Sequence, residues 1–369
     1  MRDSIVPMFN GLRWKSARLW LTLAAAAFVY AGPSEAQAKP PNGTFITFDI
    51  PGCARDILPT GINPGGAITG TCVTVINNNF VFFGFLRKPD GSISTIAVPG
   101  STSAMAGSEF TGGAAGPAIN PEGAIAGSFT DTSGATHGFL RARDGSFTTF
   151  DAPGAVNGTD FLCCITPEGA VAGISFDANF AAHGFLRAPN GTFAPFDPPG
   201  STTTVPGGIN PAEDIAGTSF DAIGAEHGFL RAREGTIATF DAPGAINGTE
   251  AAGINPAGVI VGTYFDGNFQ GHGFLRARDG TFTSFDPSGS AARFGTGAFA
   301  INPAGVIVGN YFDGTFFHGF IRAADGTFTT LDPPGSGSTL PLVINPAGIV
   351  AGEYFDASDA AHGFVFLPH

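Results

Sequence analysis

Hydrophobic residues recur along this chain in short runs bounded by turns. No stretch after the N-terminal region has the period of an amphipathic helix. The run Val259–Asp266, VIVGTYFD, is β-branched and aromatic, without alternating polar residues. Such a run predicts a strand that is buried on both faces. One copy of the surrounding pattern predicts four strands: Glu250–Asn255, Val259–Asp266, His272–Arg278 and Thr281–Asp286.

Short motifs mark the turns within this unit. Asn255-Pro256-Ala257-Gly258 separates the first two strands and has Pro and Gly where a tight type I turn favours them. Asp279-Gly280, between the third and fourth strands, is a strong hairpin signal. We therefore expect an antiparallel meander of four strands.

The unit recurs in seven copies. Its Asn/Thr-Pro turn begins at Asn63, Asn120, Thr166, Asn210, Asn255, Asn302 and Asn345. Its [His/Phe]-Gly-Phe element has the glycine at Gly84, Gly138, Gly184, Gly228, Gly273, Gly319 and Gly363. After the first copy, successive His-Gly-Phe elements are 46, 44, 45, 46 and 44 residues apart, which is in the range of four-stranded propeller blades.

The two ends of the repeat region are incomplete in a complementary way. The region opens with an isolated fourth strand, Gly43–Asp49, and the seventh copy stops after its third strand, His362–Leu367. Pairing these two strands would close a ring without leaving an open sheet edge. We therefore predict a seven-bladed β-propeller of four-stranded antiparallel blades over residues 43–369. A parallel β-helix is the alternative, but its repeats are shorter.

The recurring His-Gly-Phe-Leu-Arg followed by Asp-Gly-Thr-Phe resembles the HAF-repeat family of extracellular proteins. The resemblance covers residues 43–369, with Gly where that family usually has Ala. It implies secretion and β repeats, and it brings no reaction, catalytic residue or substrate. A weaker likeness is to streptogramin-lyase-type propellers, which lack the Asn-Pro and His-Gly-Phe pattern.

The N-terminal region has the three parts of a secretory signal peptide. Basic residues precede the apolar run Leu19–Ala31, and Ala36-Gln37-Ala38 supplies small residues for cleavage. The apolar run is short for a membrane anchor, which needs about 20 residues. We predict a signal peptide over residues 1–38, a linker over 39–42, and a secreted, extracellular or periplasmic protein.

Charge and composition limit the partners of this protein. The net charge is −13, and removal of residues 1–38 takes away four basic and two acidic residues, which brings it to −15. An acidic protein has no electrostatic attraction for nucleic acid or anionic lipid, so we exclude both. No later segment is suited to span a membrane, and we expect a monomer. The 37 Phe against two Trp indicate one aromatic residue reused at a fixed place.

Four cysteines remain after cleavage. An exported chain meets oxidising conditions, which favours disulfides over metal ligation. Cys53 and Cys72 flank one short hairpin, so we predict a disulfide between them. The neighbouring Cys163 and Cys164 would close only a strained ring, which leaves open whether they are free or have partners elsewhere.

Several polar residue types repeat in every blade. We predict that six histidines are structural, each bonded and buried within its own blade, because a position spread round a ring cannot gather one metal: His137, His183, His227, His272, His318 and His362. Acidic residues follow the second strand (Asp177, Asp221, Asp266, Asp313, Asp356) and the fourth (Asp49, Asp151, Asp197, Asp241, Asp286, Asp332). Asp at a strand end commonly accepts backbone N–H bonds.

The repeated arginines are candidate partners of these carboxylates: Arg87, Arg141, Arg187, Arg231, Arg276 and Arg322. No calcium-binding motif is present, so we expect no cofactor and no metal; calcium held by loop carboxylates is the alternative. The chain also lacks the short motifs of common hydrolases and nucleotide-binding enzymes, so we name no catalytic residue.

The departures from the repeat indicate where a ligand would bind. In such blades the first-to-second and third-to-fourth turns share one face, here called the uniform face. The second-to-third loops and the blade-to-blade connections share the other, here called the variable face. Its largest departures are Val75–Phe82, predicted to be a loop, and Ser101–Pro117. We predict ligand contacts from Asn77, Asn78, Asn79, Phe80, Met105, Glu109 and Phe110.

The leading hypothesis for function is therefore an exported binding or interaction module for a carbohydrate or protein ligand. One alternative is an enzyme, a lyase or hydrolase, whose active site would gather non-repeated polar groups with shifted pKa values at the axial mouth. Another is a structural protein of the cell envelope.

Overall fold

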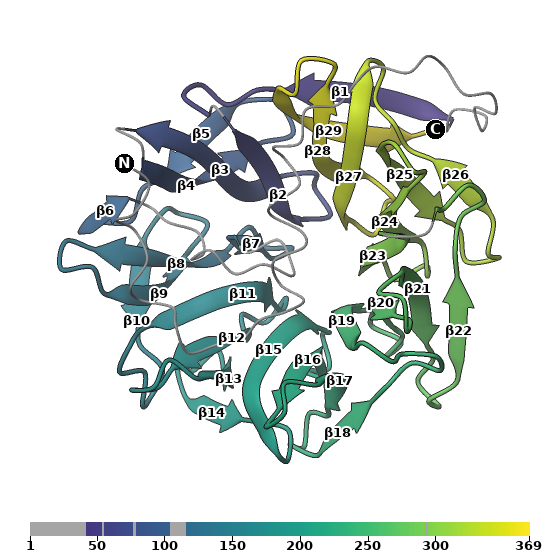
Figure 1. Ribbon diagram of the computed structural model, residues 1–369. Helices are drawn as coiled ribbons and strands as arrows, with labels where there is room; N and C mark the ends of the chain where they lie inside the picture. Colours follow the sequence, from purple (N-terminus) through teal and green to yellow (C-terminus); the bar gives the residue numbers. More distant parts are fainter. Residues whose placement is uncertain (1–41, 54, 77–78, 104–115, 292–293) are drawn as a thin grey trace, which may run out of the picture.

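The structure is a computed structural model that describes residues 42–53, 55–76, 79–103, 116–291 and 294–369. These residues form seven antiparallel sheets around a central axis and contain no helix (Figure 1). The predicted seven-bladed β-propeller is confirmed. In most blades the first strand lies next to the axis (Figure 1).

The strands follow the order of the chain. Blade 1 comprises β2 (Asp56–Ile62), β3 (Ile68–Ile76), β4 (Asn79–Arg87) and β5 (Ile93–Ile96). Blade 2 comprises β6 (Ser101–Ser103), β7 (Ala118–Ile119), β8 (Ile125–Asp131), β9 (Thr136–Arg141) and β10 (Phe147–Phe150). Blade 3 comprises β11 (Thr159–Ile165), β12 (Val171–Phe176), β13 (Ala182–Arg187) and β14 (Phe193–Phe196). Blade 4 comprises β15 (Ser201–Ile209), β16 (Ile215–Asp221), β17 (Glu226–Arg231) and β18 (Ile237–Phe240).

The remaining blades complete the ring. Blade 5 comprises β19 (Thr249–Ile254), β20 (Ile260–Phe265), β21 (Gly271–Arg276) and β22 (Phe282–Phe285). Blade 6 comprises β23 (Thr296–Ile301), β24 (Ile307–Phe312), β25 (Phe317–Arg322) and β26 (Phe328–Thr330). Blade 7 comprises β27 (Ser336–Ile344), β28 (Val350–Asp356), β29 (Ala361–Pro368) and, from the other end of the chain, β1 (Gly43–Phe48).

The ring closes as the two incomplete ends predict. Strand β1 pairs antiparallel with β29 from Gly43 opposite Pro368 to Phe48 opposite Gly363. The two strands lie side by side in Figure 1. The ring of Phe45 packs on that of Phe366, with their centroids 5.1 Å apart. The first strand of the propeller therefore supplies the fourth strand of its last blade.

One phenylalanine per blade forms the centre of the core. It is the Phe of the Gly-Phe element, and its exposure is 2% or less in all seven blades: Phe85, Phe139, Phe185, Phe229, Phe274, Phe320 and Phe364. The fourth-strand Phe of one blade packs edge-on against this residue in the next, as Phe240 does on Phe274 with centroids 6.4 Å apart. A Cβ at Gly273 would collide with the ring of Phe285, which explains the glycine beside the core Phe.

The Asn-Pro turns also join blades to one another. In blade 5 the Oδ1 atom of Asn255 accepts the backbone N–H of Val259 at 3.0 Å, which fixes the turn. Its Nδ2 atom donates to the carbonyl oxygen of Asn302 in blade 6 at 3.4 Å. Asn302 donates likewise to Asn345, and Asn345 donates to the carbonyl of Asn63 across the closure. This side chain therefore stabilises both its own turn and the ring.

Candidate binding face and buried carboxyl groups

The structure describes only part of the predicted ligand-contact set. Asn77, Asn78, Met105, Glu109 and Phe110 lie outside the described residues. The backbones of Asn79 and Phe80 belong to β4, where they pair with Ile76 and Val75 of β3. The prediction of a loop over residues 75–82 is therefore wrong for its described part. The β-branched and aromatic residues on both sides extend the hairpin as strands.

Blade 2 has two short strands, β6 and β7, before β8. Strand β6 pairs with β8 at Asp131 and Thr130, and β7 pairs with β8 at Ala126 and Ile125. In blade 4 the corresponding position is one continuous strand, β15. Blade 2 thus differs from the others at the axis.

Each repeated histidine lies between two carboxylates of its own blade. Its Nδ1 atom is 2.7–2.9 Å from the Asp that follows the fourth strand. Its Nε2 atom is 3.1–3.9 Å from the Asp at the end of the second strand, including Asp131 in blade 2. In blade 7 the first of these partners is Asp49, beside β1, so the same contact helps to close the ring. The imidazoles are partly exposed rather than buried, because they lie where the strands meet the loops.

These contacts shift the proton affinities of the groups involved. The hydrogen bond to Asp332 outweighs burial and raises the pKa of His318. Hydrogen bonds from the Ser133 hydroxyl and from backbone N–H groups lower the pKa of Asp131 to about 2. Backbone hydrogen bonds lower the pKa of Asp177 in the same way. These carboxylates are therefore ionised at neutral pH.

The repeated arginines stack on aromatic rings, and none of the six forms an ion pair with the repeated aspartates. In blade 5 the guanidinium of Arg276 lies 4.8 Å from the ring centroid of Phe240 in blade 4. Four further arginines lie 4.8–5.2 Å above the equivalent Phe of the preceding blade: Arg87, Arg187, Arg231 and Arg322. In blade 2 the equivalent position of the preceding blade is Ile96, and Arg141 lies over Phe147 of its own blade. Cation–π packing thus replaces the expected ion pairs.

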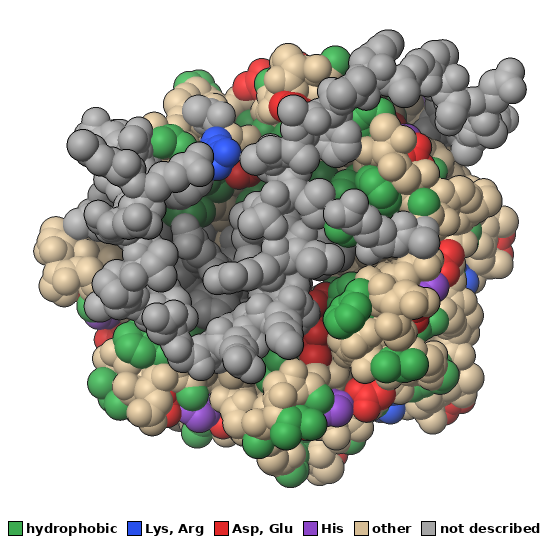
Figure 2. Space-filling view, viewed as in Figure 1, with side chains coloured by type: hydrophobic (Ala, Val, Ile, Leu, Met, Phe, Trp, Pro, Cys, Tyr) green, Lys and Arg blue, Asp and Glu red, His purple; other side chains and the backbone are tan. Residues whose placement is uncertain are grey.

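The two faces of the propeller differ in charge. Apart from Arg55, the described cationic residues all lie at the ends of third strands or in the turns that follow, on the uniform face: Arg87, Lys88, Arg141, Arg143, Arg187, Arg231, Arg233, Arg276, Arg278 and Arg322. The paired aspartates and their histidines lie at the variable face. In Figure 2 acidic, histidine and hydrophobic side chains surround the visible face, where few Lys or Arg side chains are seen.

Exposed large hydrophobic side chains gather on the variable face as well. Apart from Ile46 on β1, those among the described residues lie in its loops, its connections or the extended hairpin of blade 1: Val75, Val156, Phe180, Ile223, Ile246, Phe269 and Phe316. Ile223 is 89% exposed and Ile246 is 76% exposed. Seven of the eight exposed large hydrophobic side chains among the described residues therefore lie on one face.

Two glutamates that break the repeat meet between blades 4 and 5. Glu226 begins β17 and is 7% exposed, and Glu250 lies on β19 next to the axis. Burial raises the pKa of both carboxyl groups, that of Glu250 to about 7, and the charge of Glu250 raises the pKa of Glu226 further. A Cβ at Gly248 would lie 2.7 Å from Oε2 of Glu226, so this glycine leaves space for the carboxyl group.

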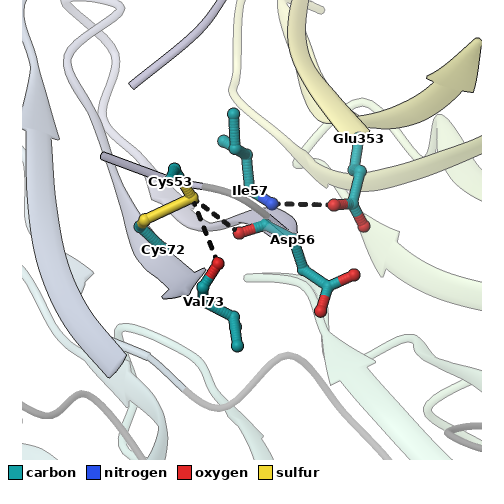
Figure 3. The surroundings of a disulfide bond; sticks show 6 residues. All are labelled: Cys53, Asp56, Ile57, Cys72, Val73 and Glu353. Carbon is teal, nitrogen blue, oxygen red and sulfur yellow. Dashed lines mark hydrogen bonds between the residues drawn. A yellow bond between two sulfur atoms is a disulfide. The ribbon is translucent and has the colours of Figure 1, made fainter. Parts of the chain in front are cut away.

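A second buried carboxyl group lies at the closure between blades 7 and 1 (Figure 3). Oε1 of Glu353 accepts the backbone N–H of Ile57 at 2.7 Å, and the side chain is 2% exposed. Burial and the nearby charge of Asp56 raise its pKa well above the usual value. Thr218 and Thr263 occupy the same strand position and accept N–H bonds from the next blade. Glu353 therefore contributes a contact between blades.

The predicted disulfide between Cys53 and Cys72 is present, with Cα atoms 5.6 Å apart. It joins the start of blade 1 to β3, beside Asp56 and Ile57 (Figure 3). Cys164 is also disulfide-bonded, so it is not free. A structural disulfide fits a protein of an oxidising compartment, outside the cell or in the periplasm.

Neither a metal centre nor a membrane helix is found in the described part of the chain. No group of three or more His, Cys, Asp or Glu side chains there is placed to hold a metal ion. No helix among the described residues has the length and hydrophobicity to cross a bilayer. The signal-peptide prediction concerns residues outside the described part.

Three solved structures share the fold of this chain, which identifies the protein as a β-propeller. Virginiamycin B lyase from Staphylococcus aureus has a TM-score of 0.56 and 11% identity, over 87% of this chain and 98% of that one. The β-propeller domain of the Trilobed protease from Pyrococcus furiosus has a TM-score of 0.59 and 10% identity, over 85% and 95%. A streptogramin B lyase has a TM-score of 0.53 and 14% identity, over 88% and 98%.

These similarities show the fold alone. No protein-family model matches the sequence, and no curated protein matches it. The Trilobed protease domain is described as having an open velcro topology, whereas β1 closes the ring here.

The sequence analysis missed the buried Glu226 and Glu353, the partly buried Glu250 and the apolar loop tips. A signal for Glu250 was present, since Asn-Gly-Thr followed by an acidic residue occurs at Asn157–Asp160 and again at Asn247–Glu250. Asp160 accepts a hydrogen bond from Ser128 at 2.7 Å, whereas Glu250 meets a second carboxyl group. Comparison of the copies would have identified both positions as equivalent acids near the start of a first strand, but not their different partners.

Proposed function

We propose that this protein is an exported binding module that holds its ligand on the variable face. The observation that carries the proposal is the gathering of exposed Val, Ile and Phe side chains on that face. The repeated histidines and turn asparagines already have partners inside the blades, so they support the scaffold. We also propose that the chain belongs to the HAF-repeat family, because it repeats the motif His-Gly-Phe-Leu-Arg followed by Asp-Gly-Thr-Phe.

Replacement of two loop-tip residues tests this function. We expect the double variant Ile223→Ser and Phe269→Ser to retain at least about tenfold less ligand from envelope fractions or on a glycan array, because apolar anchors dominate binding energy. Both side chains are more than half exposed, so folding should be unaffected. Ile46→Ser on β1 is the matched control for an exposed aliphatic residue outside the face. Equal retention by both variants would contradict the proposal.

An enzyme is the second candidate, favoured by the Glu226 and Glu250 pair. Two interacting carboxyl groups, one with a pKa of about 7, are suited to general acid–base chemistry at neutral pH. We expect turnover of a hydrolase or lyase substrate to fall at least about 100-fold in Glu250→Gln. A panel of chromogenic ester, glycoside and uronide substrates would detect it. Absence of turnover by the unmodified protein across the panel, or equal turnover by the variant, would count against an enzyme.

A further inference from the structure

The loops of the variable face join a carboxylate to an apolar side chain in one turn. In blade 3, Oδ1 of Asp177 accepts the N–H groups of Asn179 and Ala181 at 2.7 and 2.9 Å, and Phe180 stands between them at the loop tip. In blade 5, Oδ1 of Asp266 accepts two N–H groups at 2.8 and 2.9 Å in the same way. Phe269 is at the tip of that loop.

The backbone holds these tips outward. Phe180 and Phe269 have φ values of 62° and 61°, a left-handed conformation that bulky residues rarely adopt. Their side chains are 54% and 55% exposed, so burial of the rings does not offset the strain. Blade 4, between them, has Asp221 with the same turn and Ile223 exposed beside it. Three adjacent blades therefore repeat an acid next to an apolar side chain.

The carboxylates of these three turns remain ionised at neutral pH. Backbone hydrogen bonds lower the pKa of Asp177, Asp221 and Asp266. Each keeps 28–34% of its side-chain surface exposed, and the described cationic residues of these blades lie on the uniform face. The variable face thus presents fixed negative charge interleaved with apolar surface.

From this arrangement we propose that the variable face docks a cationic, apolar segment of a partner protein, with Lys or Arg beside aliphatic residues. The proposal rests on the proposed function and names its class of partner. Lys and Arg side chains meet the three carboxylates, and the aliphatic residues cover Phe180, Ile223 and Phe269. Anionic lipid and nucleic acid are repelled by the same charges, and a neutral glycan gains no ion pair from them.

Designed peptides test the charge and the apolar requirement separately. The probes are four fluorescent peptides of equal length that combine Leu with Lys, Ser with Lys, Leu with Ser, and Leu with Glu. By fluorescence anisotropy with the whole mature protein, we expect the Leu/Lys peptide to bind at least about tenfold more tightly than the other three. We expect its affinity to fall at least about tenfold between about 0.05 and 0.5 M salt. Similar binding of all four, or no binding, overturns the proposal.

Substitutions locate the site on the molecule. The triple variant Asp177→Asn, Asp221→Asn and Asp266→Asn keeps the acceptor oxygen of each turn and removes the charge. We expect it to weaken Leu/Lys binding at least about tenfold. The matched control is Asp144→Asn, Asp279→Asn and Asp325→Asn in the uniform-face turns, where Asn190 of blade 3 already serves in place of Asp. Equal losses in the two triple variants indicate only a net-charge effect and contradict the proposal.

The outcome separates this inference from the proposed function. If the Ile223→Ser and Phe269→Ser variant loses ligand from envelope fractions but the protein shows no preference for the Leu/Lys peptide, the proposed class of partner is wrong and the binding face stands. If the Ile223→Ser and Phe269→Ser variant retains ligand as well as the unmodified protein does, and no peptide preference is seen, the binding face itself is wrong.

Discussion

A chain that begins at residue 50 is expected to lose most of its stability. The truncation removes β1, so β29 keeps an unpaired edge, and the rings of Phe45 and Phe48 no longer pack on Phe364, Phe366 and Phe85. Loss of one core Phe side chain costs about 3–5 kcal/mol, so the free energy of unfolding should fall by at least about 5 kcal/mol. Urea denaturation followed by circular dichroism would measure this change.

Two controls show whether closure itself is responsible. A synthetic peptide of residues 42–50, added in excess, should pair with β29 and restore part of the lost stability. Phe48→Ala should cost about as much as Phe240→Ala, because both rings pack on the core Phe of the next blade and under an Arg. If the truncated chain unfolds at the urea concentration of the full one, the closing strand is dispensable and this account of the ring is wrong.

Stability should decrease as the pH rises from about 5 to about 8. Burial raises the pKa of Glu226, Glu250 and Glu353 above the usual 4.5, so the folded protein holds protons that the unfolded chain has released. Their contribution is complete below about pH 4.5 and is lost as the pH passes through each folded-state pKa, which is about 7 for Glu250. The raised pKa of His318 acts in the same direction.

The rise in the pKa of Glu250 from 4.5 to about 7 corresponds by itself to a decrease in the free energy of unfolding on the order of 3 kcal/mol. One pKa unit is equivalent to about 1.4 kcal/mol. Urea denaturation at a series of pH values measures it. The triple variant Glu226→Gln, Glu250→Gln and Glu353→Gln keeps the acceptor for Ile57 and should flatten the profile. The control Glu122→Gln and Glu234→Gln changes exposed residues and should leave the slope intact. A profile that rises between about pH 5 and 8 would refute the assignment.

The histidines and aspartates show which contacts can be predicted from repeated sequence positions and which cannot. Their regular spacing correctly indicated a role inside each blade, since a group present in every copy serves what every copy needs. It did not indicate that each His lies between two carboxylates, because the Asp after the fourth strand is 14 residues away in most blades and 313 away in blade 7. The arginines were assigned the wrong partner for a similar reason. For five of the six arginines the nearest ring belongs to the preceding blade, whereas Arg141 lies over Phe147 of its own blade.

The sequence by itself determined the number of blades, their four strands, the closure by β1 and the Cys53–Cys72 disulfide. The blades and their closure follow from local hydrophobic patterns, turn residues and the period at which these recur. The disulfide follows from two cysteines that flank one short hairpin. Only the tertiary structure decided the sharing of a buried space by Glu226 and Glu250, the stacking of Arg276 on Phe240 and the gathering of apolar tips on the acidic face. Those outcomes depend on which atoms of different blades meet when the ring closes, and desolvation acts on a group only through the neighbours that exclude water from it.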